Sequence, residues 1–249
     1  MPFLDSTIFF PAAKEAIERD GFAVIDGVIF RRMVADLLSA LERISSPDSL
    51  RMRGGVFAVR NLLDACPEVK ELAGSEAVRG LVEPILGSHC FPVRGILFDK
   101  VPDANWKVPW HQDLTIAVQE RVDVEGFGPW STKAGVLHVQ PPAFVLENML
   151  SVRLHLDECG EENGALRVIP GSNHRGRIPE AEIASFRQRS TEVVCSVGIG
   201  GALLMRPLIL HASSPSQSPN HRRVIHLDFA AVELPAGLRW CSDTPPMST

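Results

Sequence analysis

The sequence lacks the features that mark several large classes of protein. It has no basic excess, because 25 Lys and Arg residues stand against 30 Asp and Glu residues, for a formal net charge of −5. This balance favours neither a nucleic-acid partner nor an anionic membrane surface. Its apolar runs, such as GALLM and PLIL, are far too short to cross a bilayer. The opening MPFLDSTIFFPAAKEAIERD has no basic segment before a clean apolar core, so no signal peptide is expected.

Cysteine chemistry is equally sparse. The chain has five cysteines, an odd number, and no C-x-x-C spacing. The sequence therefore predicts neither a disulfide framework nor a thiolate zinc site. A reducing cytosol is the simplest setting for such a chain, and a cytoplasmic location is expected.

What is present indicates one globular domain of the α+β class, mainly β. The 249 residues are 45% apolar and 22% charged, and the 19 Gly and 19 Pro favour many turns between short strands. Residues 1–249 are expected to form a single domain. The first ninety residues are predicted to be a mostly helical flank with one strand at residues 21–29. Helices are predicted from their apolar spacing and from Pro and Gly punctuation at residues 11–19, 31–44 and 67–86.

After Gly87 the pattern changes to short strands, which predict a β-sandwich or barrel core over residues 91–232. In LSVRLHLDE, apolar residues alternate with polar ones from Leu150 to Asp157, as expected of a strand with one apolar face. Further strands are predicted at residues 91–101, 192–197, 202–211 and 222–232. The Gly- and Pro-containing residues 117–135 have no periodicity and are predicted to be a long loop, a candidate active-site lid.

The stretch WHQDLT carries two potential metal ligands. His111 and Asp113 are two residues apart, and in an extended chain side chains at this spacing point the same way. They can converge on a metal ion or on a proton in transfer. The alternative is a surface turn with a hydrogen-bonded Asp, and the motif alone does not decide between them.

His211 is a candidate third ligand. It is predicted to end the strand PLILH before the turn-rich ASSPSQSPN, where a barrel strand would deliver a side chain to the mouth. Two imidazoles and one carboxylate form the facial triad that holds Fe(II) and leaves other positions open. We expect His111, Asp113 and His211 to form this triad.

Arg222 follows His211 by eleven residues on the predicted strand RRVIHLDFA. If this strand pairs with that of His211, the guanidinium lies near the metal, where it suits a carboxylate ligand. Ser213 could add a hydroxyl donor. Arg223 is the next residue. The alternative to a role beside the metal is that Arg222 and Arg223 form a solvated basic pair at a turn, and this is expected to hold for one of the two.

Together these motifs resemble the phytanoyl-CoA dioxygenase family of Fe(II)- and 2-oxoglutarate-dependent oxygenases. The resemblance is carried by HQD at 111–113, ENGALRVIPGS at 162–172, H-x-S with the later Arg, and the opening helix–GFAVIDGVI–helix pattern, over about residues 10–232. It implies a double-stranded β-helix (jelly-roll, cupin-like) core with N-terminal flanking helices. It also implies His111, Asp113 and His211 as iron ligands, and Arg222 with Ser213 beside the distal carboxylate of 2-oxoglutarate.

The resemblance further implies a dioxygenase that hydroxylates a small molecule and releases succinate and CO2, with Fe(II), 2-oxoglutarate and O2 as cofactor and co-substrates. Related halogenating enzymes have a small residue in place of Asp113, so a hydroxylase or desaturase is expected. Family members act on very different substrates, so the resemblance names none. The alternative is a cupin-like metal-dependent binder, isomerase or hydrolase, which would keep the three ligands but need no Arg222.

Several other polar residues have candidate positions in or around the cavity. Arg153, His155 and His138 could line the cavity or form a hydrogen-bonded wall, and Gln140 could reach it from a strand end. His226 and Asp228 share a face with Arg222 and could form a buried pair behind the ligands. Gln112 is expected to point away from the metal. Lys100, Trp106 and Trp110 are expected to flank the HQD segment, and the two tryptophans could form an aromatic wall beside the metal or fill the core. Three histidines are expected at surface turns: His89, His174 and His221.

The lid candidate also suggests a substrate class. It holds three carboxylates and only two cations, Arg121 and Lys133, whereas the phosphates of a CoA ester favour a basic mouth. We therefore expect a small uncoupled metabolite, with an amine or hydroxyl that meets a lid carboxylate. The alternative is that these charges are solvated and select nothing.

Overall fold

Two facing antiparallel sheets form the core of the protein. The computed structural model describes residues 6–44, 50–52, 56–100, 107–133, 135–217 and 221–242. The larger sheet has seven strands in the order β1-β12-β9-β14-β4-β3-β2. These strands are β1 (Phe22–Ile25), β2 (Leu50–Met52), β3 (Val56–Val59), β4 (Phe91–Lys100), β9 (Met149–His155), β12 (Ala202–Met205) and β14 (Arg222–Ala230).

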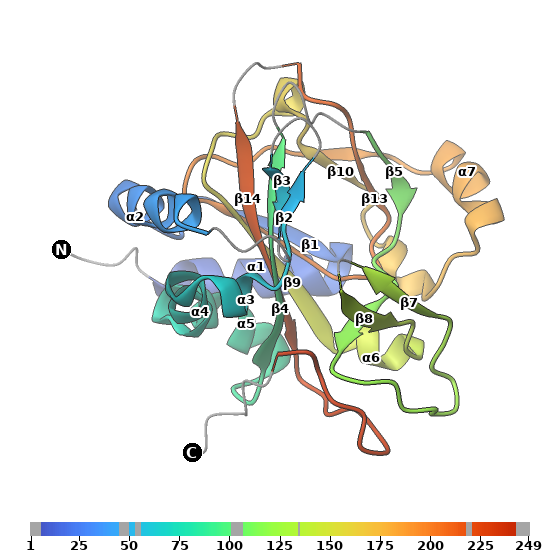
Figure 1. The fold of residues 1–249 in the computed structure, drawn as a ribbon. Coiled ribbons are helices and arrows are strands. Elements are labelled where there is room, and N and C mark those ends of the chain that lie inside the picture. Colours follow the sequence, from blue (N-terminus) through green and yellow to red (C-terminus); the bar gives the residue numbers. More distant parts are fainter. Residues whose placement is uncertain are drawn as a thin grey trace.

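A four-stranded sheet faces it, in the order β11-β10-β13-β5, and a three-stranded sheet lies beside both, in the order β6-β8-β7 (Figure 1). The first comprises β5 (Val108–His111), β10 (Leu166–Val168), β11 (Val193–Cys195) and β13 (His211–Ser213). The second comprises β6 (Ile116–Val118), β7 (Trp130–Lys133) and β8 (Val136–Val139). This arrangement is the predicted double-stranded β-helix, or jelly roll.

The N-terminal helices cover the outer face of the large sheet (Figure 1). They are α1 (Ser6–Asp20), α2 (Arg31–Glu42), α3 (Leu62–Ala65), α4 (Pro67–Gly74) and α5 (Glu76–Leu86). The predicted stripe of α2 faces inward, with Val34, Leu37 and Leu41 buried in the apolar cluster that the helices form with β9 and β14. α4 ends and α5 begins at Ser75, which caps the N-terminus of α5. Its hydroxyl accepts a hydrogen bond from the Val78 amide at 3.4 Å.

Short helices complete the described chain: α6 (Ala143–Glu147), α7 (Glu180–Gln188) and the 3-10 helices η1 (Glu161–Asn163) and η2 (Ser172–Arg175). Within the described ranges, none of the helices combines the length and the apolar character that crossing a bilayer requires.

The strands β9 and β14 carry polar residues on the face that lies between the sheets. The apolar residues predicted on β9, such as Leu150, Val152 and Leu154, pack outward against the helices. The alternate residues Ser151, Arg153 and His155 are also buried. Because a buried polar face costs free energy unless it is satisfied, this interior indicates a site rather than a core.

Several expectations about strands are corrected. The first ninety residues supply three strands to the large sheet instead of one, because β2 and β3 join its edge. Residues 117–135 are not wholly a loop: β6 begins at Ile116 and β7 spans Trp130–Lys133. These strands have only three and four residues, too few to show a period, and pairing with β8 forms them.

The predicted strand over residues 202–211 is two strands. It ends at Met205, and a turn through Pro207 separates it from β13, which begins at His211. His211 therefore opens a strand of the smaller sheet instead of ending one of the larger. The apolar run PLIL is buried in this turn, which periodicity cannot distinguish from a buried strand.

Candidate metal centre

His111, Asp113 and His211 meet at the end of the smaller sheet. His111 ends β5 and lies directly opposite His211 in the antiparallel pair β5–β13. Asp113 lies just past the strand, where its amide donates a hydrogen bond to the Pro207 carbonyl at 2.9 Å. The Nε2 atoms of His111 and His211 lie 3.8 and 3.7 Å from the two carboxylate oxygens of Asp113.

The three groups can share one ion. Their ligand atoms lie within 4.8 Å of one another, so all of them lie within about 2.8 Å of a common point, close to metal-bond reach for N and O ligands. Each imidazole is oriented through its other nitrogen, because Nδ1 of His111 donates to the Pro109 carbonyl at 2.8 Å and Nδ1 of His211 to the Ile209 carbonyl at 3.0 Å. Both Nε2 lone pairs are thereby free for a metal.

The electrostatics favour the ligating protonation states of His211 and Asp113. Burial lowers the pKa of His211 to about 4, so its imidazole is neutral at physiological pH. Burial acts to raise the pKa of Asp113, but the neighbouring imidazoles of His211 and His111 outweigh it and hold that pKa below its ordinary value. An ionised carboxylate and a neutral imidazole are the forms that bind metal.

The Gln112 side chain holds the backbone between His111 and Asp113 in place through hydrogen bonds. It is buried, and its Nε2 donates to the carbonyls of Gly176 at 2.8 Å and Leu208 at 2.6 Å. Its Oε1 accepts from the Ile178 amide at 2.8 Å. As predicted, this side chain points away from His111 and Asp113, and it fastens their segment to two others.

A cavity of about 260 Å³ opens beside the triad. Among the described residues, its wall carries one carboxylate, that of Asp113, and five cationic side chains, those of Arg60, Arg94, Lys133, Arg153 and Arg222. Such a wall concentrates small anions.

Arg222 reaches this cavity from a different direction than predicted. Its strand β14 does not pair with the His211 strand; it pairs with β4 and β9 in the opposite sheet. The guanidinium therefore crosses the interior between the sheets and donates to the Gly164 carbonyl. It is 3% exposed. Lys100 lies opposite Arg222 in the β4–β14 register, and its Nζ donates to the Ser213 hydroxyl at 2.9 Å.

These groups fit a dianionic co-substrate. Lys100, Arg153 and Arg222 are all buried, and neither Arg153 nor Arg222 forms an ion pair with a carboxylate among the described residues. The Nε atoms of Arg153 and Arg222 and both ring nitrogens of His155 are buried without a hydrogen-bond partner in the described part of the chain. Buried cations need a countercharge, so the cradle around Ser213 suits the carboxylate of a bound diacid.

A hydrogen-bonded network lies behind the triad on β14. His226 and Asp228 form the predicted buried pair, with His226 Nε2 2.9 Å from an Asp228 carboxylate oxygen. Ser151 and Arg94 donate to the same carboxylate, each at 2.6 Å, and Arg153 lies 2.8 Å from Nδ1 of His226. This network fixes the cavity wall next to Asp113.

The remaining predicted residues divide between the interior and the surface. Arg153 lines the cavity, whereas Gln140 does not. Trp110 packs under the guanidinium groups of Arg167 and Arg187, outside the cavity, and the aromatic wall is formed by Phe98 instead. Trp106 lies outside the described residues. Three histidines are exposed as expected: His89, His174 and His221.

The carboxylates of residues 117–135 do not reach the cavity, which contradicts the expectation that they receive the substrate. Asp123 pairs with Arg121 at 3.2 Å, Glu120 lies 3.5 Å from Arg239, and Glu125 is exposed. The cation Lys133 faces the cavity instead, where its Nζ donates to the Thr115 hydroxyl at 3.0 Å.

Sequence reasoning missed three cavity cations: Arg60, Arg94 and Lys133. Arg94 shares one face of β4 with Ile96 and Phe98 by period 2, and these apolar neighbours hid its inward position from a reading of polar alternation. Arg60 follows β3 and Lys133 ends β7, and both strands are too short to indicate an inward face.

The sequence and the fold both resemble known proteins. The chain matches the phytanoyl-CoA dioxygenase (PhyH) family over residues 17–224. It is 25% identical to L-proline trans-4-hydroxylase of Streptomyces griseoviridis, in an alignment that covers 88% of this chain and 86% of the relative.

Solved structures of similar fold include AviO1 from Streptomyces viridochromogenes Tue57, with a TM-score of 0.66 and 26% identity over 95% of this chain and 99% of that chain. EctD from S. alaskensis, solved with 2-oxoglutarate and 5-hydroxyectoine, has a TM-score of 0.70 and 21% identity over 93% of this chain and 79% of that chain. At this identity, EctD supports the fold alone.

Proposed function

Because the chain belongs to the phytanoyl-CoA dioxygenase family, we propose that His111, Asp113 and His211 hold its Fe(II). We propose further that Arg222 and Ser213 receive 2-oxoglutarate. The protein is a non-haem Fe(II)- and 2-oxoglutarate-dependent dioxygenase that hydroxylates a small molecule. The observation that carries the site assignment is the triad at one wall of a cavity whose opposite wall holds Arg222.

When bound, Fe(II) and 2-oxoglutarate supply the oxidising chemistry: O2 and 2-oxoglutarate are consumed, succinate and CO2 are released, and one oxygen atom enters a substrate C–H bond. The chain supplies the geometry. Nδ1 hydrogen bonds orient both imidazoles, and Gln112 fixes the backbone between His111 and Asp113. Three ligands on one face leave the other face open to co-substrate and O2.

The second contribution of the chain is charge. Arg222 and Lys100 stand at the Ser213 end of the cavity, where the distal carboxylate of a five-carbon diacid can be neutralised. The alternative, a cupin-like metal protein without oxygenase activity, would keep the triad but would gain nothing from these buried cations. The buried cations therefore support the oxygenase assignment.

We propose that residues 1–249 form one domain in which residues 117–135 act as a lid, since β6 and β7 carry this segment beside the cavity. We propose a cytoplasmic location, supported by the five cysteines, which form no disulfide with one another in the described part of the chain. The partner of the site is a small molecule. L-proline, the substrate that the name of the Streptomyces griseoviridis relative implies, belongs in the first substrate screen.

The test is Fe(II)-dependent conversion of 2-oxoglutarate to succinate, with a search for a product 16 Da heavier in metabolite pools. His211→Ala should abolish both turnover and Fe(II) binding, whereas His174→Ala, which changes an exposed histidine, should preserve them. Retention of turnover by His211→Ala would overturn the ligand assignment. Iron binding without substrate-stimulated succinate formation would favour the cupin-like alternative.

A further inference from the structure

A second group of cations lines the same cavity, away from Arg222. Along β4, Lys100 pairs with Arg222 and Arg94 pairs with Asp228. These two positions are six residues apart, about 20 Å along a strand. Arg60 and Lys133 line the cavity together with Arg94. The cavity therefore has cations toward both ends of β4, and those around Arg94 lie beyond the reach of a single five-carbon diacid bound at Arg222.

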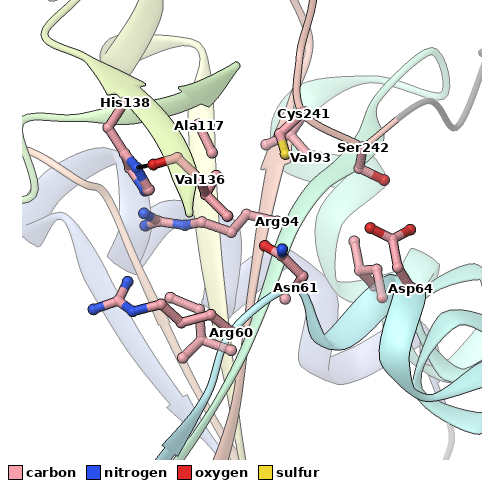
Figure 2. A pocket seen from close by; sticks show the side chains of 13 residues that line it. Arg60, Asn61, Asp64, Val93, Arg94, Ala117, Val136, His138, Cys241 and Ser242 are labelled. Carbon is pink, nitrogen blue, oxygen red and sulfur yellow. Dashed lines mark hydrogen bonds between the residues drawn. The ribbon is translucent and has the colours of Figure 1, made fainter. Parts of the chain in front are cut away.

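A smaller pocket of about 20 Å³ shares Arg60 and Arg94 with this cavity and is also lined by His138. Figure 2 shows the guanidinium groups of Arg60 and Arg94 extending in the same direction. The His138 ring lies near the Arg94 guanidinium. We call the set of Arg60, Arg94, Lys133 and His138 the distal subsite.

His138 is prepared as a hydrogen-bond acceptor. Its ring is 1% exposed, and its Nδ1 donates to the Val136 carbonyl at 2.9 Å. Its Nε2 therefore carries a lone pair, and this atom is buried without a hydrogen-bond partner among the described residues. Burial lowers the pKa of His138 to about 4, with further contributions from Arg94, Lys133 and Arg60, so the ring stays neutral beside three cations.

Arg94 is held in place by its own partners. Its Nε donates to Asp228 at 2.6 Å, and Asp228 is fixed in turn by Ser151 and His226. With Nε engaged, the terminal nitrogens remain as the fork that can bind a carboxylate. A buried acceptor beside several donors matches a ligand that carries both an anionic group and an N–H or O–H group.

We propose that the distal subsite binds the carboxylate of the hydroxylation substrate through Arg60, Arg94 and Lys133, and that Nε2 of His138 accepts a hydrogen bond from a substrate N–H or O–H. This proposal rests on the proposed function, since it assigns the Arg222 end to 2-oxoglutarate. The substrate class is a small carboxylic acid that carries a donor group. A cavity of about 260 Å³ that also holds the co-substrate suits such a small molecule.

The test measures anion binding directly, because a simple carboxylate should bind the subsite whatever the full substrate is. The protein is loaded with 2-oxoglutarate and with Zn(II), which accepts the same ligand types as Fe(II) and is diamagnetic. The His138 ring signals, assigned with His138→Gln, are followed by NMR during titration with acetate, acetamide and inorganic phosphate at constant ionic strength. Acetate should shift these signals saturably in the millimolar range, and acetamide should not.

Two variants locate the bound anion. Lys133→Met and Arg60→Gln should each weaken acetate binding at least fivefold, whereas Arg121→Met should not, because Arg121 is an exposed cation of the 117–135 segment outside the cavity wall. Equal shifts with acetate and acetamide, or no effect of both variants, would overturn the subsite. Saturation by phosphate but not by acetate would overturn the carboxylate assignment. A failure of 2-oxoglutarate to bind at the outset would instead reject the proposed function.

Discussion

Arg222 and Arg223 are neighbours in the sequence, yet they lie on opposite faces of β14. Arg222 is buried in the cavity wall, whereas Arg223 is half-buried on the other face and bonded twice to Asp157, each time at 2.8 Å. Their chemistry is identical, so they form a matched pair of variants. Any difference between them comes from position alone.

Arg222→Leu is expected to raise the KM for 2-oxoglutarate at least tenfold, since a charge-assisted hydrogen bond contributes about 1.5–3 kcal/mol. Steady-state succinate formation measures the change, and calorimetry under anaerobic conditions should show an almost unchanged Kd for Fe(II). Arg223→Leu is the control and should leave the KM within about twofold. An unchanged KM in Arg222→Leu would remove this residue from the co-substrate site.

The second prediction at the residue scale concerns the buried side chain of Lys100. Burial, followed by the neighbouring Arg222 charge, lowers the pKa of Lys100 to about 7. Without ligand, the folded state therefore releases this proton before the unfolded state does. The free energy of unfolding should rise with pH between about 7 and 10.5 through this group, and the rise should be absent in Lys100→Met.

Binding of a dianion beside Lys100 should reverse this release. At pH 8, 2-oxoglutarate binding should be accompanied by proton uptake, measured by calorimetry in buffers of different ionisation enthalpy. The uptake should disappear in Lys100→Met. Proton uptake of equal size in both proteins would show that another group titrates.

At the scale of elements, the metal centre depends on how three segments are fastened together. β5 brings His111, β13 brings His211, and the turn through Pro207 holds the Asp113 amide. Gln112 joins these parts, because its side chain bonds to Gly176, Ile178 and Leu208. It touches neither the cavity nor a ligand atom, so it is a positioning residue.

Gln112→Ala should lower Fe(II) affinity about 10–100-fold, as for other residues that orient metal ligands. It should also lower the free energy of unfolding by about 1–3 kcal/mol, because three buried backbone groups lose their partner. Anaerobic calorimetry and urea unfolding measure the two effects. Gln188→Ala at the exposed end of α7 is the control and should change neither. Normal iron affinity in Gln112→Ala would refute the positioning role.

At the scale of the whole molecule, the larger sheet has apolar packing on its outer face and several buried charged residues on its inner face. The helices cover the outer face of β9 and β14, whereas the face between the sheets holds Arg153, Arg222 and Lys100. Without an anion, these buried cations repel one another. This repulsion should lower the free energy of unfolding of the ligand-free protein, and a bound anion should restore it.

Binding of 2-oxoglutarate with Fe(II) should stabilise the fold by about 2.7 kcal/mol at a concentration of 100 times Kd. For a chain of this size, that corresponds to a rise in Tm of about 5–10 °C. Arg222→Leu should lose most of this rise and should match or exceed the wild-type Tm without ligand. Differential scanning calorimetry measures both quantities. An equal ligand-induced rise in the two proteins would contradict the interior-charge account.

The sequence by itself determined the features that depend on neighbouring residues. The apolar stripe of α2, the alternation along β9 and the H-x-D spacing all follow from the geometry of a single segment. Even His226 and Asp228, two apart on β14, were predictable as a pair. Family motifs then supplied the ligand order from His111 to His211, which local patterns alone leave open.

Only the tertiary structure decided which sheet each strand joins, because pairing depends on contacts between distant segments. It placed Arg222 on the wall opposite His211 instead of on a neighbouring strand, and it made His211 the first residue of β13. It also directed Arg60, Arg94 and Lys133, from three separate strands or strand ends, toward one cavity. A short strand has no readable period, and a lone cation has no inward or outward preference until its neighbours are in place. The charge of the cavity, and with it the proposed carboxylate substrate, is therefore a property of the folded chain.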